Sequence, residues 1–548
     1  MESIEKKLKD EVQRTPVSYP DFDQMFESIQ RGELRDKDTT LEGTRSRRKR
    51  KAAIAVSIAV ALTAAPVYAA INYDWTDVLS TRTGIQTALE QGLGQSIEQS
   101  VTKNGITLTV HTAFTDENRT VLLYSLNPGQ GNSQHIYYES MQLVDSKGTP
   151  IEGNYVQRWN EELGMYQGYF ETDWVMSTQN TEMDFELKNI RWTEDTSYPI
   201  AFDPKQQSNQ TFWVQKDGID TLSINAFEQS EDKLLVKSSV SLIDPSDKDW
   251  SWYRLEARKG SGEVIAEAEP SVFGTPGLKQ EYTTQQIYNT TEVNEEGTEF
   301  RLVYDREVNR SDGEWTLHFS LSKKQMESGT VKKQLDIPIE EIPGGSKITE
   351  MIVTPTQIRI VLQHEEEYTR VPYLNYHLDI GGKRITGFDA YQEDKYKSEL
   401  RFELSPDIEL SSIGASPITL IAAHRADELK GSEEPVLLTG ISEEKQSFTQ
   451  DYEGYPVTWT YYTKDNNLYI ESESSDLKFG GINQTYYGQG KDKVYGVPSI
   501  QDFAGNGKNK SIDVYENYTG ASELEIYAFM YRTEQPEAEL RVTLTDGM

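Results

Sequence analysis

The chain contains no cysteine among its 548 residues. Disulfide bonds and thiolate metal sites are therefore excluded, and any folded part must be stabilised by core burial alone. Histidine is scarce as well: the six histidines are scattered, and no two have the helical spacing of metal ligands. The sequence consequently predicts no zinc site and no cofactor.

Catalytic motifs are missing too. The sequence has no Gly-x-Ser-x-Gly nucleophile elbow and no phosphate-binding glycine loop. Residues 320–323 match Ser-x-x-Lys but lack the accompanying Ser-Asp-Asn and Lys-Thr-Gly motifs, so we interpret the match as chance. We predict that the protein is not an enzyme, and a hydrolase acting on the cell wall is the least favoured alternative.

Positive charge is sparse beyond residue 51. Residues 1–51 carry 13 Lys and Arg against 11 Asp and Glu, whereas the rest of the chain carries 42 against 78. Such an anionic surface repels nucleic acid and anionic lipid headgroups and keeps a protein soluble. Nucleic-acid binding is therefore excluded.

The chain has one long uncharged apolar run, at residues 52–71. A helix of about 20 residues covers the roughly 30 Å hydrocarbon core of a bilayer. Basic residues are retained on the cytoplasmic side, and aromatic residues favour the outer interface. The run is flanked by Arg45, Arg47, Arg48, Lys49, Arg50 and Lys51 before it and by Tyr73 and Trp75 after it. We predict a single transmembrane helix in the cell membrane, with the N-terminus cytoplasmic and the C-terminal bulk extracellular.

A cleavable signal peptide is the alternative for the same run. Small residues around Ala69 resemble a cleavage site, which would release the rest of the chain. The region before a signal peptide is normally short, whereas 51 residues precede this run. A retained anchor is therefore favoured, and both interpretations place the bulk of the chain outside.

Residues 1–51 show two short amphipathic helical patterns separated by Pro16 and Pro20. They are too short to close a core of their own, so we expect a partner groove to cover them. The predicted contact residues are Ile4, Leu8, Val12, Phe22, Met25, Phe26 and Ile29. The alternative is that this tail lies on the inner membrane surface or has no fixed structure.

The pattern of the residues after the predicted membrane helix indicates mainly β-structure. Residues 84–94 suggest a short helix closed by glycine. From Ile106 the sequence alternates, with Ile106, Leu108 and Val110 expected inward and His111 outward. A turn at residues 116–118 and a second apolar segment at 121–124 then predict a hairpin.

This hairpin pattern recurs along the chain. It returns clearly from residue 218 and more faintly from residues 346 and 455. Intervals of this length suit β-sandwiches of about 100 residues. We predict a mainly β exterior of tandem immunoglobulin-like β-sandwich modules, although a continuous β-structure with other divisions stays open. The predicted divisions are a cytoplasmic helical tail at 1–51, a transmembrane helix at 52–71, and β-modules at 72–204, 205–343, 344–442 and 443–548.

One acidic loop, at residues 244–249, resembles a calcium-binding loop. It brings three carboxylates into six residues, which suits the oxygen ligands that calcium prefers. It lacks the spacing and the distal glutamate of an EF-hand, and Lys248 lies among the ligands. We favour a solvated turn and keep Asp244, Asp247 and Asp249 as a weak calcium candidate.

The order of motifs from residue 47 to residue 125 resembles a Gram-positive family of single-pass membrane proteins defined by an extracellular domain of unknown function. The resemblance is carried by the basic run, the alanine-rich span, Tyr73-Asp74-Trp75, Gly84-Ile85 with Ala88, Gly94 to Ile97, Gln99 to Val101, Asn104 to Thr107, Asp116 and Arg119 to Val121. It covers residues 50–200 well, and residues 211–340 are similar to the β-domain that often follows. Members are regarded as anti-sigma-like regulators of extracytoplasmic-function sigma factors.

The resemblance implies a cytoplasmic sigma factor as the partner of the tail and an unknown extracellular ligand for the β-modules. The tail is shorter than the zinc-associated anti-sigma domain and contains neither Cys nor His. Any inhibition would therefore use a helix-in-groove contact. The alternative function is a surface adhesin or ligand-binding stack, for which tyrosine-rich β-surfaces are suited and the tail is a plain anchor.

Overall fold

The computed structural model describes residues 73–546, except 130–134, 207–208, 231–232, 245–251, 277–280, 328, 343, 391, 393, 409–412, 414–415, 465, 503–508 and 521. The predicted tail and the predicted membrane helix lie outside the described residues. In the part that is described, no helix combines the length and the apolar character needed to cross a bilayer.

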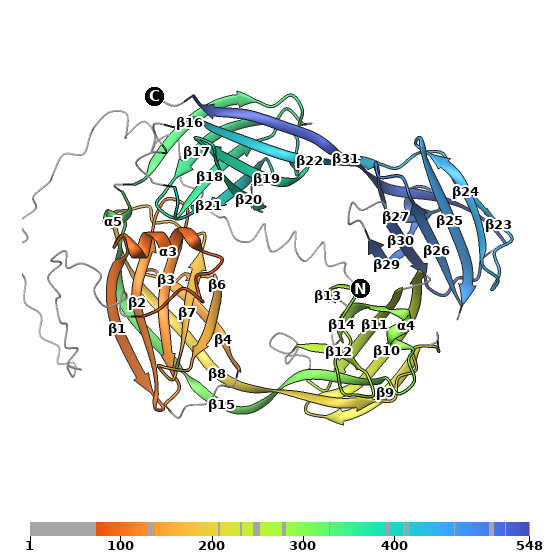
Figure 1. The fold of residues 1–548 in the computed structure, drawn as a ribbon, viewed down its shortest axis with the longest axis horizontal. Helices are drawn as coiled ribbons and strands as arrows, with labels where there is room; N and C mark the ends of the chain where they lie inside the picture. Colours follow the sequence, from red (N-terminus) through yellow and green to blue (C-terminus); the bar gives the residue numbers. More distant parts are fainter. Residues whose placement is uncertain are drawn as a thin grey trace, which may run out of the picture. The chain divides into compact units, whose positions relative to one another are not determined.

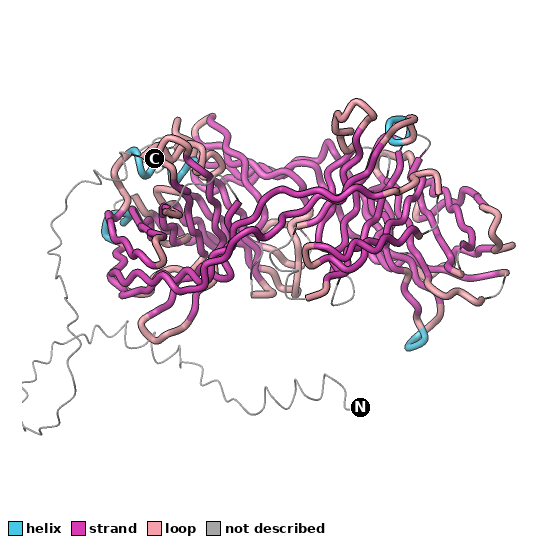
Figure 2. Tube along the Cα trace, turned by 90° about the horizontal axis from the view of Figure 1, so that it is seen from below, coloured by secondary structure: helices cyan, strands magenta, loops and turns pink. Residues whose placement is uncertain are grey.

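The described part is mainly β, as predicted. Its strands form five sheets in which the paired strands are antiparallel, and Figure 2 shows only a few short helical segments among them. The described helices are α3 (Thr83–Glu90), α4 (Thr290–Val293), α5 (Lys324–Glu327) and the 3-10 helix η3 (Gly490–Asp492).

The first module packs two sheets around one core. One sheet has the order β1 (Gln95–Lys103), β2 (Ile106–Thr115), β3 (Thr120–Asn127), β7 (Met165–Thr172) and β6 (Asn154–Asn160). The other has the order β12 (Tyr253–Arg258), β15 (Glu299–Ser322), β8 (Asn180–Ile200), β4 (His135–Asp145) and β5 (Pro150–Ile151). Leu108 and Phe170 from the first sheet meet Phe185 and Trp315 from the second in the core.

Helix α3 covers the opposite face of the first sheet (Figure 1). Its Ile85 and Leu89 pack with Phe114, Val121 and Leu123. Strand β3 is thus buried on both faces, which explains why its apolar residues run continuously instead of alternating. The helix overlaps the segment predicted to be helical and begins one residue before it, and Gly92 follows it in the left-handed conformation, as expected of a terminating glycine.

The second module shares strands with the first. Its own sheet has the order β13 (Glu269–Pro276), β14 (Glu281–Asn289), β11 (Lys233–Leu242), β10 (Ile219–Ser230) and β9 (Gln210–Lys216). This sheet packs on β12, the end of β8 and the start of β15, through a core that includes Leu222, Val236, Leu255 and Leu302. Strands β8 and β15 therefore form a long ribbon that serves two cores, as Figure 1 shows.

The third and fourth modules repeat this arrangement. The large sheet contains β16 (Val331–Pro338), β17 (Lys347–Val353), β18 (Gln357–Gln363), β21 (Lys397–Glu403), β20 (Lys383–Ala390), β19 (Tyr373–Ile380), β22 (Ile418–Lys430), β31 (Glu523–Thr545), β27 (Phe479–Tyr487), β28 (Val494–Tyr495) and β23 (Val436–Thr439). The fifth sheet contains β24 (Gln446–Tyr452), β25 (Tyr455–Lys464), β26 (Asn467–Ser474), β30 (Asn509–Tyr515) and β29 (Val497–Asp502). The third-module core includes Leu378, Phe402 and Val542, and the fourth-module core includes Trp459 and Tyr531.

Each of the four recurring sequence patterns forms a hairpin in a different module. The hairpins are β2 with β3, β10 with β11, β17 with β18, and β25 with β26. The period-two alternation thus identified the hairpins, including the two for which it was faint.

The module boundaries differ from those predicted. Strand β15 returns to the first module after the second is complete. Trp315 and Leu321 therefore belong to the first core, although the predicted division at 205–343 assigns them to the second module. Strand β31 likewise returns to the third module, where Leu540 and Leu544 are buried. The second and fourth modules are therefore insertions into the first and third. Local patterns could not show this, because a period-two alternation indicates a strand but not which core its side chains join.

His111, expected to point outward, lies on the face away from the core between the two sheets but is not exposed. Its side chain is buried, and its Nε2 lies 2.8 Å from Ser125 Oγ. The ring lies on the face of the sheet that α3 covers, with its centroid 4.8 Å from that of Tyr73 and 5.7 Å from that of Trp75, so the segment before α3 buries it. The inward prediction for Ile106, Leu108 and Val110 is confirmed.

Candidate functional site

The β2–β3 turn holds the first module against the third. Asp116 accepts hydrogen bonds through Oδ1 from the backbone N–H of Asn118 and Arg119, which fixes the turn. Its other oxygen accepts from Thr356 Oγ1 at 2.7 Å, and Glu117 binds Lys332 Nζ at 2.6 Å. Successive residues of one tight turn thus contact the third module.

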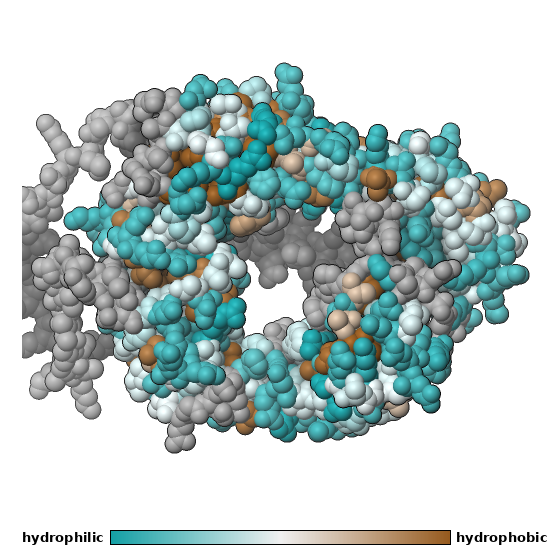
Figure 3. Space-filling view, viewed as in Figure 1, coloured by the Kyte–Doolittle hydropathy of each residue, from teal (hydrophilic) through white to brown (hydrophobic). Residues whose placement is uncertain are grey.

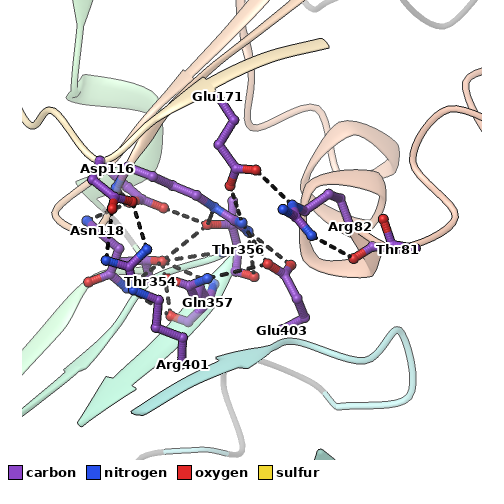
Figure 4. Close-up of polar contacts among 12 residues, drawn as sticks. Thr81, Arg82, Asp116, Asn118, Glu171, Thr354, Thr356, Gln357, Arg401 and Glu403 are labelled. Carbon is purple, nitrogen blue, oxygen red and sulfur yellow. Dashed lines mark hydrogen bonds and ion pairs between the residues drawn. The ribbon is translucent and has the colours of Figure 1, made fainter. Parts of the chain in front are cut away.

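Arg119 is the centre of this contact (Figure 4). Its Nη1 lies 2.7 Å from Glu171 Oε1 in the first module and 2.6 Å from Glu403 Oε1 in the third. Nη2 donates to Glu403 Oε2 at 2.9 Å and to the Thr356 carbonyl at 3.2 Å. The side chain is only 3% exposed, so this fork of charge-assisted bonds is shielded from water. We call Arg119 and its partners Glu171, Glu403 and Thr356 the Arg119 network.

Asn118 and Arg359 extend the contact. Asn118 donates through Nδ2 to the Gln357 carbonyl at 3.1 Å, and Arg359 donates to the Asn118 carbonyl. On the same surface, Arg401 binds both carboxylate oxygens of Asp173 at 2.7 and 3.0 Å. The two modules are therefore joined mainly by polar groups.

Helix α3 brings the backbones of the two modules together. Thr83 Oγ1 donates to the Leu404 carbonyl at 2.8 Å. Gly84 lies so close to the third module that an added Cβ would sit 1.8 Å from the Thr356 carbonyl oxygen. Only glycine fits this position, because any side chain would collide with backbone.

The charges of the network support one another. Burial opposes the charge of Arg119, but the Glu403 and Glu171 carboxylates outweigh it and raise the pKa of the guanidinium. Burial likewise opposes the charge of Glu171, yet Arg119 and Arg82 hold its pKa below the ordinary value. Arg119 and Glu171 are therefore charged at neutral pH, as a buried ion pair requires.

A polar cavity of about 490 Å³ opens beside the network. The first module lines it with Arg82, Glu152, Glu171 and Asp173, and the third with Gln357, Phe388, Arg401 and Glu403. Its volume is within the range of small-molecule sites, but its walls are more charged than is usual. Figure 3 shows that hydrophilic residues cover most of the displayed face, in keeping with the acidic composition.

The second and fourth modules meet through a different chemistry. Leu235, Tyr469 and Ile512 form a small buried apolar cluster, against which Phe227 packs. The Phe227 and Tyr469 rings are 6.0 Å apart between centroids, and Tyr462 stacks on Tyr469 at 5.1 Å. The first module thus contacts the third, and the second contacts the fourth.

The predicted site residues are only partly described. Tyr73 and Trp75, expected at the membrane flank, have ring centroids 4.8 and 5.7 Å from that of His111, and Trp75 is buried. Asp244 is exposed just after β11, whereas Asp247 and Asp249 lie outside the described residues. The residues of the predicted tail and the basic residues before the predicted membrane helix also lie outside the described residues. No group of three potential metal ligands occurs among the residues that are described.

Sequence reasoning did not identify the Arg119 network as a site. Arg119 and Glu403 are 284 residues apart, and no periodicity connects them. Lys323, from the chance Ser-x-x-Lys match, has its amine bound to Glu117 at 2.8 Å. The one available signal was that Asp116 and Arg119 belong to the motif that carried the family resemblance.

Comparison with known proteins places that motif within a recognised domain. Residues 44–127 match a family described as a domain of unknown function, DUF4179. No curated protein matches the chain. The crystal structure of the conserved domain protein from Bacillus anthracis is 10% identical, and the match covers 57% of this chain and 90% of that one. Its TM-score of 0.16 is too low to support any inference.

Proposed function

We propose that this protein is a single-pass membrane regulator of the anti-sigma type, found in Gram-positive cells. Its cytoplasmic tail binds an extracytoplasmic-function sigma factor, and its ectodomain of immunoglobulin-like modules receives an envelope signal. Catalysis has no part in this proposal.

The position of the DUF4179 match carries the proposal. The match begins before the predicted membrane helix and ends in β3, so it includes both the span and the turn at residues 116–119. Directly after the predicted span, Trp75 and Leu79 are buried in the cluster that also holds α3. Helix α3 and the turn then contact the third module. A change at the Arg119 network would therefore act on the folded segment that follows the predicted membrane helix in the sequence.

The tail is the direct test of the regulator function. We expect the full-length protein to retain a sigma factor in a pull-down, and the double substitution Phe22→Asp with Phe26→Asp to abolish that retention, because both rings lie on the predicted apolar face. Ser28→Asp introduces a similar charge off that face and should have little effect. Retention that the double variant does not reduce would contradict the proposal.

Membrane topology can be tested because the chain has no background thiol. A cysteine replacing Glu161, which is exposed in the first module, should react on intact cells with a membrane-impermeant maleimide. A cysteine replacing Asp10 should react only after lysis. Labelling of the Asp10 position on intact cells would contradict a cytoplasmic tail.

An adhesin is the second candidate, and one surface favours it. The fourth module carries a cluster of aromatic rings in which Tyr486 stacks on Tyr527 at 5.4 Å and contacts Tyr495 at 5.3 Å. Tyr495 and Phe529 are both more than 40% exposed. Such rings suit carbohydrate or peptide contacts. Deletion of residues 2–40 separates the two functions, because an adhesin would keep its phenotype and a regulator would lose it.

A further inference from the structure

The described strands divide into two halves that share no sheet. The sheets of the first and second modules take all their strands from residues 95–322, and those of the third and fourth modules take theirs from residues 331–545. In each half, one long strand pair runs from one module to the other: β8 with β15, and β22 with β31 (Figure 1). Bending between the modules of one half would break backbone hydrogen bonds of this pair, so each half moves as one body.

The two halves are fastened to each other beside the chain connection between them. Glu117 in the β2–β3 turn binds Lys323, where the connection begins, at 2.8 Å, and Lys332 in β16, where the second half begins, at 2.6 Å. The same turn carries Arg119 with its buried ion pair to Glu403. The contact between the first and third modules thus combines a covalent connection with charge-assisted bonds. It is therefore the pivot of any movement between the halves.

The contact between the second and fourth modules has no such covalent connection. Each of these modules is an insertion, and the chain enters and leaves it through the long strand pair of its own half. The buried side chains of the contact are Leu235, Tyr469 and Ile512. They lie on the outward faces of the two sheets and belong to neither module core. The contact can therefore separate without unfolding either module.

A lysine makes this contact costly to close. Lys237 follows Leu235 by two residues in β11, so both side chains lie on the face of the sheet that meets the fourth module. Burial there lowers the pKa of Lys237, although the charge of Glu516 in the fourth module opposes the change. No carboxylate of the described residues lies within ion-pair distance of its ammonium group. Closing the contact thus desolvates a charge without pairing it, which offsets part of the gain from apolar burial.

We infer that the contact between the second and fourth modules is a releasable latch, and that the two halves turn about the contact between the first and third modules when the latch opens. The difference between the two contacts carries this inference. One is ion-paired and lies beside the covalent connection, whereas the other is apolar, holds few buried side chains and is weakened by an unpaired charge. As the two states of a signal-receiving ectodomain, the open and closed forms rest on the function proposed above, whereas the opening itself does not.

Distance measurements between paired spin labels test the inference in the full-length protein, because the chain has no other thiol. Cysteines replacing Thr211 and Thr449, which are exposed in the second and fourth modules, report on the latch. Cysteines replacing Glu161 and Thr211 report on the first half alone. We expect Ile512→Asp to move most molecules to a longer Thr211–Thr449 distance and to leave the Glu161–Thr211 distance unchanged. An unchanged Thr211–Thr449 distance, or an equal change in both pairs, would overturn the inference.

Substitutions on both sides of the latch separate opening from a fold defect. Leu235→Asp changes the second module instead of the fourth, and failure to reproduce the longer distance would count against the latch. Ile512→Ala is milder and should leave the open and closed populations both detectable. Adding Lys237→Met should then raise the closed fraction at least threefold, whereas adding Lys216→Met, at an exposed lysine of the same module, should not. Equal effects of the two lysine changes would reject the part assigned to Lys237.

The sigma-factor pull-down keeps this inference distinct from the proposed function. Opening of the latch in a protein whose tail retains no sigma factor would establish the movement and reject the regulator. Tail-dependent retention by a protein whose halves stay together in the latch variants would reject the latch alone.

Discussion

Among single residues, Arg119 has the greatest influence on the contact between the first and third modules. Its replacement by alanine would leave Glu171 and Glu403 largely buried beside an empty space. Removing one member of a buried ion pair typically costs about 3–5 kcal/mol, because the remaining charge is uncompensated. We therefore expect Arg119→Ala to lower the free energy of unfolding by that amount in urea denaturation followed by tryptophan fluorescence.

Arg158→Ala is the matched control for this substitution. Arg158 lies on the exposed side of β6 and has no ion pair to a described residue, so the change should be within about 0.5 kcal/mol. An effect of Arg119→Ala no larger than that of the control would show that the network contributes little.

Asp513 gives the fold a pH dependence. Burial raises the pKa of its carboxyl to about 6, although Thr485 donates to it from both its backbone N–H and its hydroxyl. An aspartate in the unfolded chain titrates near pH 4. The stabilisation of the protonated form is thus fully present below about pH 4 and is lost as the pH rises through 6. The difference amounts to about 3 kcal/mol.

We therefore expect Asp513→Asn to remove this contribution. Thermal unfolding of the wild type between pH 4 and 7 should show a loss of stability with rising pH that is smaller in the variant. Asp492→Asn changes an exposed aspartate in η3 and should keep the wild-type profile. Identical profiles for wild type and Asp513→Asn would contradict the raised pKa.

Among the elements, α3 depends on a single glycine for its contact with the third module. Gly84→Ala would push Cβ into the Thr356 carbonyl, so either the helix or the turn beginning at Thr354 must move. Such overpacking typically costs about 1–3 kcal/mol. We expect a lower melting temperature in calorimetry. Gly260→Ala, whose added Cβ would have an ordinary 3.4 Å contact in the second module, should be close to neutral.

The sequence predicted an element correctly wherever burial of one face sets the spacing of its apolar residues. The alternation at Ile106, Leu108 and Val110 identified β2, and the glycine-bounded segment identified α3. It did not show that His111 is buried, because the residues that cover it, Tyr73 and Trp75, lie in a segment that no local pattern connects with β2. It also could not connect Arg119 with Glu403, because a long-range ion pair has no local signature.

At the scale of the whole molecule, the insertion topology predicts which fragment can fold alone. Residues 196–305 contain the second core, and their ends are paired through Thr196 and Tyr304. We expect this fragment to unfold cooperatively. A fragment cut at the predicted boundaries, 205–343, would lack Ile200 and expose Trp315 and Leu317 without their first-module partners. It should therefore be less stable and aggregate, as circular dichroism and gel filtration can show.

The two long strand pairs, β8 with β15 and β22 with β31, also determine the order in which a nascent chain can complete its cores. The first module needs the strand that ends at Ser322, and the third needs the strand that ends at Thr545. Each inserted module uses the first part of that strand and is complete before the last part, which finishes its host, has been synthesised. Until then the host exposes an unfinished sheet edge, which is prone to mispairing. Maturation therefore proceeds from the inserted modules outward, and the segment beside the predicted membrane helix is among those that must wait.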